Sequence, residues 1–208
     1  MADNSNYKQI SVSKTSKALV EFCDNIRFQN QFAWPFDRGA RILCRMNDYS
    51  LGKGEKLVSV SHNLLLTDIK KIKTKIEAIE NTNLMLSTTN RKITEKVTIF
   101  AEDKILNFDA YKNEQNPEQR RFTQINISYN PTMNNPYCIM VSNGWGIPEE
   151  TSTGGTKVKK DSMKITNSVK MFLTYDGMFA LFEKVNMFID AVMTVGVEKY
   201  LKTQEQSK

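Results

Sequence analysis

The stretch LVSVSHNLLLTDI, residues 57–69, contains a strand that passes directly into a helix. Apolar and polar residues alternate along its first half, which is typical of a strand with one buried face. Thr67 and Asp68 follow, and either side chain can accept hydrogen bonds from the first free amides of a helix. Isoleucines then recur at helical spacing, at positions 69, 72, 76 and 79. The stretch therefore predicts a strand-to-helix junction near Leu66.

A second junction of this kind lies 107 residues further along, where Leu173-Thr174 repeats Leu66-Thr67. The helix that follows it is apolar over most of its circumference. Four strands are predicted before each helix: 17–23, 26–34, 40–49 and 56–66 in the first half, and 97–111, 120–130, 137–142 and 163–174 in the second. Their connections are short, which favours antiparallel pairing. The sequence therefore predicts an α+β fold of two ββββα repeats that form antiparallel sheets with two packed helices.

The repeat also predicts how the chain is divided. The expected divisions are a polar N-terminal tail at 1–13, a single domain at 14–200 with repeats at about 14–86 and about 93–200, and a C-terminal tail at 201–208. The glycine-rich segment 143–161 is predicted to be a long loop. Each helix can cover only one side of its sheet. The other side must meet water, another subunit or a ligand.

Composition argues against several classes of protein. The 208 residues are 40% apolar and 25% charged, as in ordinary soluble globular domains. No apolar run approaches the roughly 18–20 residues that span a bilayer, and the polar N-terminus does not resemble a signal peptide or an import leader. The three cysteines are odd in number and widely spaced, which favours reduced thiols and a cytoplasmic location. The net charge of +6 is compatible with an anionic partner.

Signals for catalysis and for cofactor binding are weak. The chain has one histidine, His62, and no CxxC pair, which argues against zinc. A catalytic role for His62 would need a nucleophile and an orienting carboxylate, and the sequence identifies neither. Gly154-Gly155-Thr156-Lys157 lacks the full spacing of a phosphate-binding loop. We therefore expect a protein that is not an enzyme and that uses no cofactor and no metal ion.

Alternation along the strands separates two faces, and one of them suits nucleic acid. In the strand 120–130, a cationic side chain, an aromatic ring and two amides share one face, and in the strands 26–34 and 40–49 arginines lie opposite the apolar residues. Such a face can stack bases and neutralise phosphates, although polar residues on the wet side of a sheet also serve solubility alone. These candidates are Arg27, Arg41, Arg45, Arg120, Phe122, Gln124 and Asn126.

The first predicted helix carries a second basic set. These lysines are expected on its outer side, where they are either simply solvated or form a secondary electrostatic contact. They are Lys70, Lys71, Lys73 and Lys75.

Several segments together resemble the Whirly-type family of single-stranded nucleic-acid-binding proteins, whose domain is two ββββα repeats. VKMFLT at 169–174 and MFALF at 178–182 resemble the last strand and the phenylalanine-rich helix of the family. LVSVS at 57–61, YCIMVSN at 137–143 and SKALVE at 16–21 are similar to three earlier segments. The chain also resembles the Whirly-like RNA-binding proteins of large nucleus-forming bacteriophages. The resemblance covers most of residues 14–196.

The resemblance implies a single-stranded nucleic-acid-binding protein that is a homo-oligomer and favours RNA slightly over DNA. Binding would combine base stacking and phosphate neutralisation on a sheet face, in the cytoplasm, or in that of an infected bacterium if a phage encodes the chain. The alternative is a structural or assembly protein that uses the open sheet face for self-association. The expected nucleic-acid-binding residues are Lys17, Arg27, Arg41, Arg45, Arg120, Phe122, Gln124 and Asn126.

Overall fold

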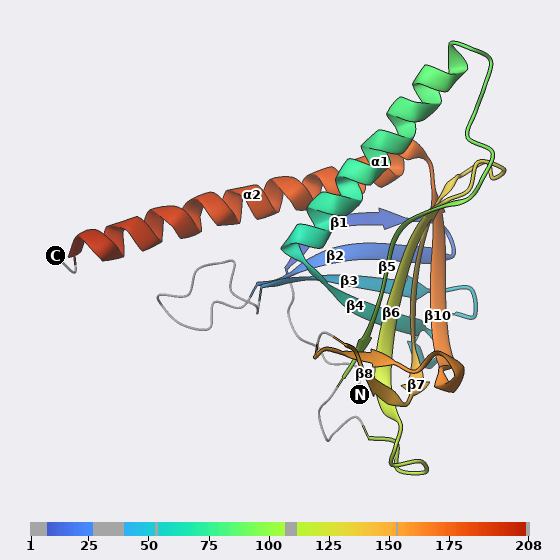
Figure 1. Ribbon diagram of the computed structural model, residues 1–208, viewed down its shortest axis with the longest axis vertical. Helices are drawn as coiled ribbons and strands as arrows, with labels where there is room; N and C mark the ends of the chain where they lie inside the picture. Colours follow the sequence, from blue (N-terminus) through green and yellow to red (C-terminus); the bar gives the residue numbers. More distant parts are fainter. Residues whose placement is uncertain (1–7, 27–39, 53, 107–111, 153, 207–208) are drawn as a thin grey trace.

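The structure is a computed structural model that describes residues 8–26, 40–52, 54–106, 112–152 and 154–206. The described residues form an α+β fold with two four-stranded antiparallel sheets and two helices, as the sequence predicts (Figure 1). The first sheet consists of β1 (Gln9–Lys14), β2 (Ala18–Asn25), β3 (Arg41–Asp48) and β4 (Val58–Leu65), in that order. The second has the order β10 (Lys164–Leu173), β7 (Tyr137–Gly146), β6 (Arg120–Tyr129) and β5 (Val97–Ile105).

Each sheet leads directly into its helix, which confirms both predicted junctions. β4 continues into α1 (Leu66–Ser87), and β10 is followed by α2 (Tyr175–Gln206). At the first junction the Asp68 carboxylate accepts a hydrogen bond from the amide of Leu65 at 3.2 Å, so Asp68 lies in the first turn and Leu65 is the N-cap. At the second, Thr174 Oγ1 accepts one from the amide of Gly177 at 3.2 Å. Short polar side chains therefore satisfy amides that a helix start leaves free.

The first strand differs from the prediction. Residues 9–13 were expected in a polar tail, but they belong to β1, which pairs with β2 at the edge of the first sheet. The predicted strand 26–34 falls almost entirely outside the described residues. β1 is difficult to predict from the sequence, because the burial of its side chains does not follow the apolar residues: Ser11 is buried while Val12 is 43% exposed. An edge strand can be held by backbone pairing with one neighbour. Its side chains then need not alternate clearly between apolar and polar.

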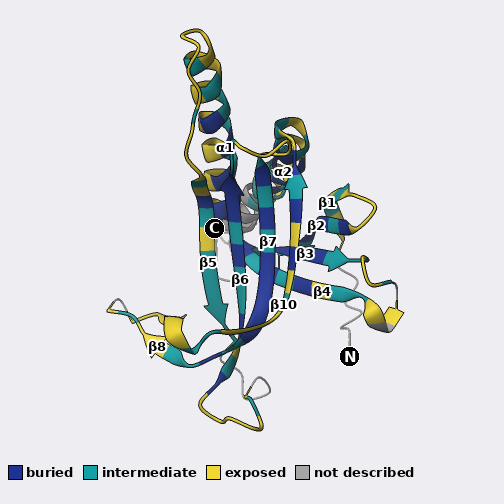
Figure 2. Ribbon diagram, turned by 90° about the vertical axis from the view of Figure 1, so that its right-hand side faces the viewer, coloured by how far each residue is buried: buried dark blue, intermediate teal, exposed yellow. Residues whose placement is uncertain are grey.

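The core lies where the inner faces of the sheets meet each other and the two helices. Strands of one sheet run across those of the other, and α1 and α2 pack together over them (Figure 1). The Phe22 ring of β2 packs on the Phe182 ring of α2 with centroids 5.0 Å apart. Figure 2 shows burial concentrated along β7 in the centre of the second sheet. One continuous cluster of apolar residues therefore holds both halves of the chain together.

Two further segments are more ordered than predicted. The expected loop 143–161 contains the end of β7 and a hairpin of β8 (Pro148–Glu150) and β9 (Thr156–Val158). The Val158 amide ties this hairpin to β5 through the Asp103 carboxylate at 3.1 Å. Helix α2 runs six residues into the expected C-terminal tail, and its C-terminal part extends beyond the sheets (Figure 1). No helix in the described part of the chain is long and apolar enough to cross a membrane.

Candidate nucleic-acid interface

Each sheet has an outer face, because the two sheets pack on each other through their inner faces. Residues paired directly across neighbouring strands point to the same side, so the register assigns every strand residue to a face. The inner side of the second sheet is marked by Thr123, whose hydroxyl lies 3.0 Å from His62 Nδ1 of the first sheet. Arg41 and Arg45 therefore project from the outer face of the first sheet, whereas Gln124 and Asn126, with Arg120, project from that of the second, so the candidates do not form one surface.

On the first outer face, Arg41 and Arg45 lie on the same side of β3, as predicted. Arg45 is nevertheless engaged: its Nε donates to Glu21 Oε1 at 2.6 Å, and Glu21 is only 7% exposed. Gln9 donates to the other carboxylate oxygen at 2.7 Å. A half-buried ion pair of this kind neutralises the charge that a phosphate would need. The expected role of Arg45 in nucleic-acid binding stays a prediction, and its guanidinium is already paired with Glu21.

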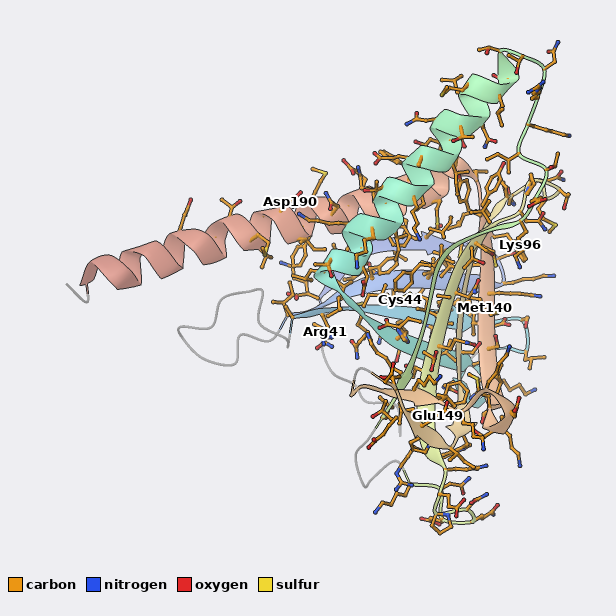
Figure 3. The ribbon with its side chains drawn as sticks, in the orientation of Figure 1. Arg41, Cys44, Lys96, Met140, Glu149 and Asp190 are labelled. Atoms are coloured by element: carbon orange, nitrogen blue, oxygen red, sulfur yellow. The ribbon has the colours of Figure 1, made fainter. Side chains whose placement is uncertain are left out.

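The remaining basic candidates are scattered. Lys17 is exposed in the turn between β1 and β2, and Arg27 lies outside the described residues. Arg41 Nη1 donates to the carbonyl of Ala40 at 2.9 Å, and Figure 3 shows Arg41 well away from Met140 of the second sheet. Arg120 Nη1 donates to the carbonyl oxygens of residues 117 and 119 at the start of β6. The predicted set therefore does not converge on a single site.

The burial of Phe122 differs most from the prediction. It lies on the outer face of β6, as predicted, but it is fully buried and cannot stack on a base. The β8–β9 hairpin folds back at this end of the sheet, and Val158 lies with the Phe122 ring over Gly146. Since Phe122 and Val158 are separate from the main core, they form a small second cluster that anchors the hairpin.

The rest of this outer face is uncovered, and we call it the open face. It contains the predicted Gln124 and Asn126, which are partly exposed. In Figure 2 neither helix crosses in front of the second sheet. The register adds side chains from the two neighbouring strands that the sequence analysis did not select. The open face consists of Gln124, Asn126, Cys138, Met140, Ser168, Lys170 and Phe172, with Lys96 at its edge.

The open face is cationic and contains an aromatic ring suited to stacking, with a methionine beside it. Met140 and Phe172 are partly exposed, and Lys170 and Lys96 are exposed. Burial raises the pKa of the Cys138 thiol, while the charges of Lys170 and Lys96 act to lower it, so both ammonium groups lie near Cys138. The same alternation that selected Gln124 could have found Lys170 and Phe172, because both lie opposite the apolar residues of β10.

Lys73 is placed differently from the other lysines of α1. It was expected on the outer side of the helix, but it lies between the two helices with a side chain 19% exposed. Its ammonium group is 2.8 Å from Glu77 and 3.2 Å from Glu183 of α2, and it lies over the Phe179 ring. Lys70, Lys71 and Lys75 are exposed, as predicted. Lys73 therefore joins the two helices instead of lying on the solvated side of α1.

The partners of His62 are supplied by the second sheet, which explains why the sequence did not reveal them. Its Nε2 lies 3.0 Å from Glu102, and its Nδ1 lies 3.0 Å from the Thr123 hydroxyl. A nucleophile, a base and a carboxylate are thus present, but the His62 side chain is fully buried and no substrate can reach the ring. Lys104 also contacts Glu102 at 3.0 Å and donates to the carbonyl of Asn63. This network joins the two sheets.

The stability of the fold is expected to fall as the pH decreases below about 6.5, the usual pKa of histidine. Burial lowers the pKa of His62, and Lys104 adds to this, although the Glu102 hydrogen bond acts against it. Just below pH 6.5, His62 therefore binds a proton in the unfolded chain but stays neutral in the folded chain. Stability decreases with falling pH by at most about 1.4 kcal/mol per pH unit. Urea denaturation between pH 7.5 and 5.5 measures this slope.

The chain has a single histidine, so His62→Gln should flatten the slope in that window. Thr123→Val, which removes only the hydroxyl partner, should retain it. Glu102 acts separately: burial acts to raise its pKa, but hydrogen bonds and charges from His62 and Lys104 outweigh burial and lower it. The stability that Glu102 contributes is therefore lost only as the pH falls from the ordinary pKa of a glutamate toward the lower pKa of Glu102 in the folded chain. An unchanged slope in His62→Gln would contradict the assignment.

Within the described ranges, no group of three or more His, Cys, Asp or Glu side chains could hold a metal ion. Comparison of the chain with models of known families, with curated proteins and with solved structures finds no significant match. Function has therefore to be inferred from the open face itself.

Proposed function

We propose that this chain is a single-stranded nucleic-acid-binding protein and that the open face of the second sheet holds the strand. The observation that supports this most is the composition of that face. Exposed lysines stand beside a partly exposed phenylalanine, a methionine and two amides, and no helix covers them. Stacking contributes about 1–3 kcal/mol per base and accepts any base, while lysines neutralise phosphates. Binding by these means has little sequence preference.

The shape of the face supports single strands over duplex. A four-stranded sheet is too broad for the major groove, which admits a helix or a two-stranded ribbon. A single strand has splayed bases whose rings can reach Phe172 and Met140 and whose edges can reach Gln124 and Asn126. The acidic side chain that the described strands of this sheet place on the outer side is Asp103, and its carboxylate is already bonded to the Val158 amide. A negative strand therefore meets little repulsion there.

The preference for RNA over DNA rests on the resemblance to Whirly-like RNA-binding proteins, with whose ββββα repeats the observed element order is compatible. A homo-oligomer and a cytoplasmic location belong to the same proposal. The three cysteines are free thiols, which supports a reducing compartment.

Fluorescence anisotropy of labelled single-stranded RNA, single-stranded DNA and duplex DNA of equal length, each at several salt concentrations, tests the proposal. The single strands should bind more tightly than the duplex. Lys170→Gln should weaken binding and reduce the slope of log K against log salt by about 0.7, the value for one lost phosphate contact. Phe172→Ala should weaken binding by about 1–3 kcal/mol with little change in slope, because stacking releases no counterions.

Lys71→Gln is the matched control, since Lys71 is an exposed lysine of α1 with a side chain 69% exposed. Removal of its charge should leave affinity and slope nearly unchanged. Duplex binding as tight as single-strand binding at the same salt would contradict the proposal. An effect of Lys71→Gln equal to that of Lys170→Gln would place the contact on the helix instead.

Self-association through the same face is the second candidate function. Ile165 of β10 is 55% exposed and pairs with Gly144, which places it at the end of the outer face next to the open face. An exposed apolar residue beside an uncovered sheet suits a protein interface as well as a strand. Sedimentation velocity separates the two functions. Assembly that is insensitive to salt, with no retention of single strands, would favour the structural function.

A further inference from the structure

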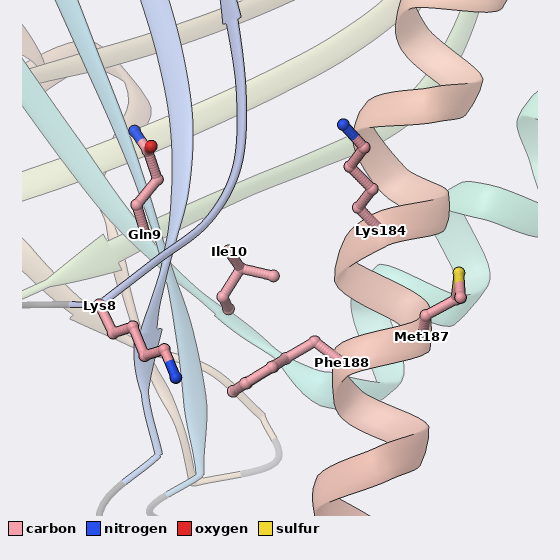
Figure 4. Close-up of a pocket in the computed structure, with 6 residues that line it drawn as sticks. All are labelled: Lys8, Gln9, Ile10, Lys184, Met187 and Phe188. Atoms are coloured by element: carbon pink, nitrogen blue, oxygen red, sulfur yellow. The ribbon is translucent and has the colours of Figure 1, made fainter.

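A groove lies between the edge strand β1 and helix α2, apart from the open face (Figure 4). Its volume is about 340 Å³, at the lower end of the volume range of small-ligand sites. None of its residues belongs to the open face. The groove is lined by Lys8, Gln9, Ile10, Lys184, Met187 and Phe188.

The floor of the groove is apolar and only partly covered. Ile10 and Phe188 are half-buried against the core, and Met187 is 62% exposed. These side chains come from a strand and a helix that pack together, so the groove is formed by the fold itself. A half-buried phenylalanine beside an exposed methionine leaves an apolar surface with one side open to water. Such a surface suits a flat ring that rests on it, with its other side solvated.

The rim of the groove carries two lysines without acidic partners. Among the described residues, neither Lys8 nor Lys184 makes an ion pair, and no acidic side chain lines the groove. Other lysines of the helical layer are neutralised: Lys70 pairs with Asp190 at 2.7 Å, and Lys73 pairs with Glu183. In Figure 4 Lys8 lies on the strand side of the groove and Lys184 on the helix side, with their ammonium groups at opposite ends of it.

We infer that this groove binds one nucleotide of a single strand, with its base on Phe188 and Met187 and the phosphates on either side of that base bound by Lys8 and Lys184. The inference rests on the proposed function, because the nucleotide belongs to the strand that the open face binds. An acyl chain would need an enclosed apolar channel, whereas Met187 remains largely in water. A flat, anionic ligand matches both the open floor and the cationic rim.

The groove gives the protein a second anchor for a long strand. Once the open face holds one part of a strand, binding of another part in the groove becomes intramolecular and is favoured by a high effective concentration. Strands long enough to reach both sites should bind more tightly than short strands. Groove variants should remove this length dependence and leave the affinity for short strands unchanged.

Amide chemical shifts of the full chain, titrated with uridine 5′-monophosphate, test the inference. We expect saturable shifts at residues 8–10 and 184–188, and smaller shifts with uridine or inorganic phosphate alone. Lys184→Gln should weaken the nucleotide about two- to fivefold, as expected for loss of one exposed ion pair. Phe188→Leu keeps the apolar contact with the core and removes the ring, so it should weaken the nucleotide while the protein remains folded. Lys170→Gln, on the open face, should leave these groove shifts unchanged.

The outcomes separate the groove from the open face. Nucleotide shifts confined to the open face, or equal groove shifts with phosphate alone, would overturn the groove and leave the proposed function intact. Groove shifts that octanoate produces at lower concentration than the nucleotide would overturn it in favour of an amphipathic ligand. Normal groove shifts together with no single-strand binding to the open face would contradict the proposed function instead. Loss of length dependence in Lys184→Gln would support the groove.

Discussion

Replacement of Phe122 by alanine is expected to lower the free energy of unfolding by about 3–5 kcal/mol, as for a large aromatic side chain removed from a packed site. Phe122 is fully buried, and the hairpin residue Val158 lies with it over Gly146. The truncation leaves a cavity on the outer side of the second sheet and removes the anchor of the hairpin. Urea denaturation of the wild type and the variant measures the loss.

Binding experiments on the same variant distinguish this expectation from a stacking role. Under conditions where Phe122→Ala remains folded, its affinity for single strands should be close to that of the wild type. Phe172→Ala is the matched comparison, because Phe172 is partly exposed on the open face. It should lose affinity and less stability. A Phe122 variant of normal stability and reduced affinity would show that the ring reaches the strand after all.

Replacement of Gly144 by alanine is expected to destabilise the protein by about 3 kcal/mol or more, at the upper end of the range for overpacked sites. A Cβ atom at this position would lie 2.1 Å from the carbonyl oxygen of Lys164 and 2.9 Å from the Cα atom of Ile165. Both are backbone atoms, so no rotamer change relieves the clash. The strands β7 and β10 would have to separate where their register already shifts, between Ile165 and Asn167. Thermal and urea denaturation provide the measurement.

Gly177→Ala in the first turn of α2 is the control. There a Cβ atom would meet its nearest neighbour, Thr174 Oγ1, at 3.4 Å, which is an ordinary contact distance. Alanine also favours a helix over glycine by up to about 1 kcal/mol. This variant should therefore be neutral or slightly stabilised. Equal stability of the Gly144 and Gly177 variants would contradict the close approach of β7 and β10.

The two large effects concern the same end of the second sheet. The missing side chain of Gly144 lets the backbone of β10 approach β7 closely, and that of Gly146 lets Val158 lie over the outer face of the sheet. Phe122 occupies the space that remains. The open face begins beyond this cluster, so the hairpin sets one boundary of the surface that we propose for nucleic acid.

Local patterns were sufficient for the repeated architecture. The alternation in residues 57–66 and 163–174, followed by helical spacing, predicted both junctions, and the structure has β4 with α1 and β10 with α2 at these places. Period-two patterns also assigned sides correctly: Arg41 and Arg45 share one side of β3, and Phe122 and Gln124 share one side of β6. Such assignments depend only on neighbours along the chain, because successive side chains of a strand point to opposite faces.

Tertiary structure decided which of those side chains remain free. Phe122 is covered by a hairpin more than thirty residues later, at Val158, and Arg45 is neutralised by Glu21 on the adjacent strand. Lys73 is drawn between the helices by Glu183, 110 residues away. Periodicity states the side to which a residue points, but burial and charge pairing depend on segments that come together only in the fold. Long-range contacts therefore decided which candidates are buried or paired and which belong to the open face. No local sequence pattern contains the free energy of these contacts.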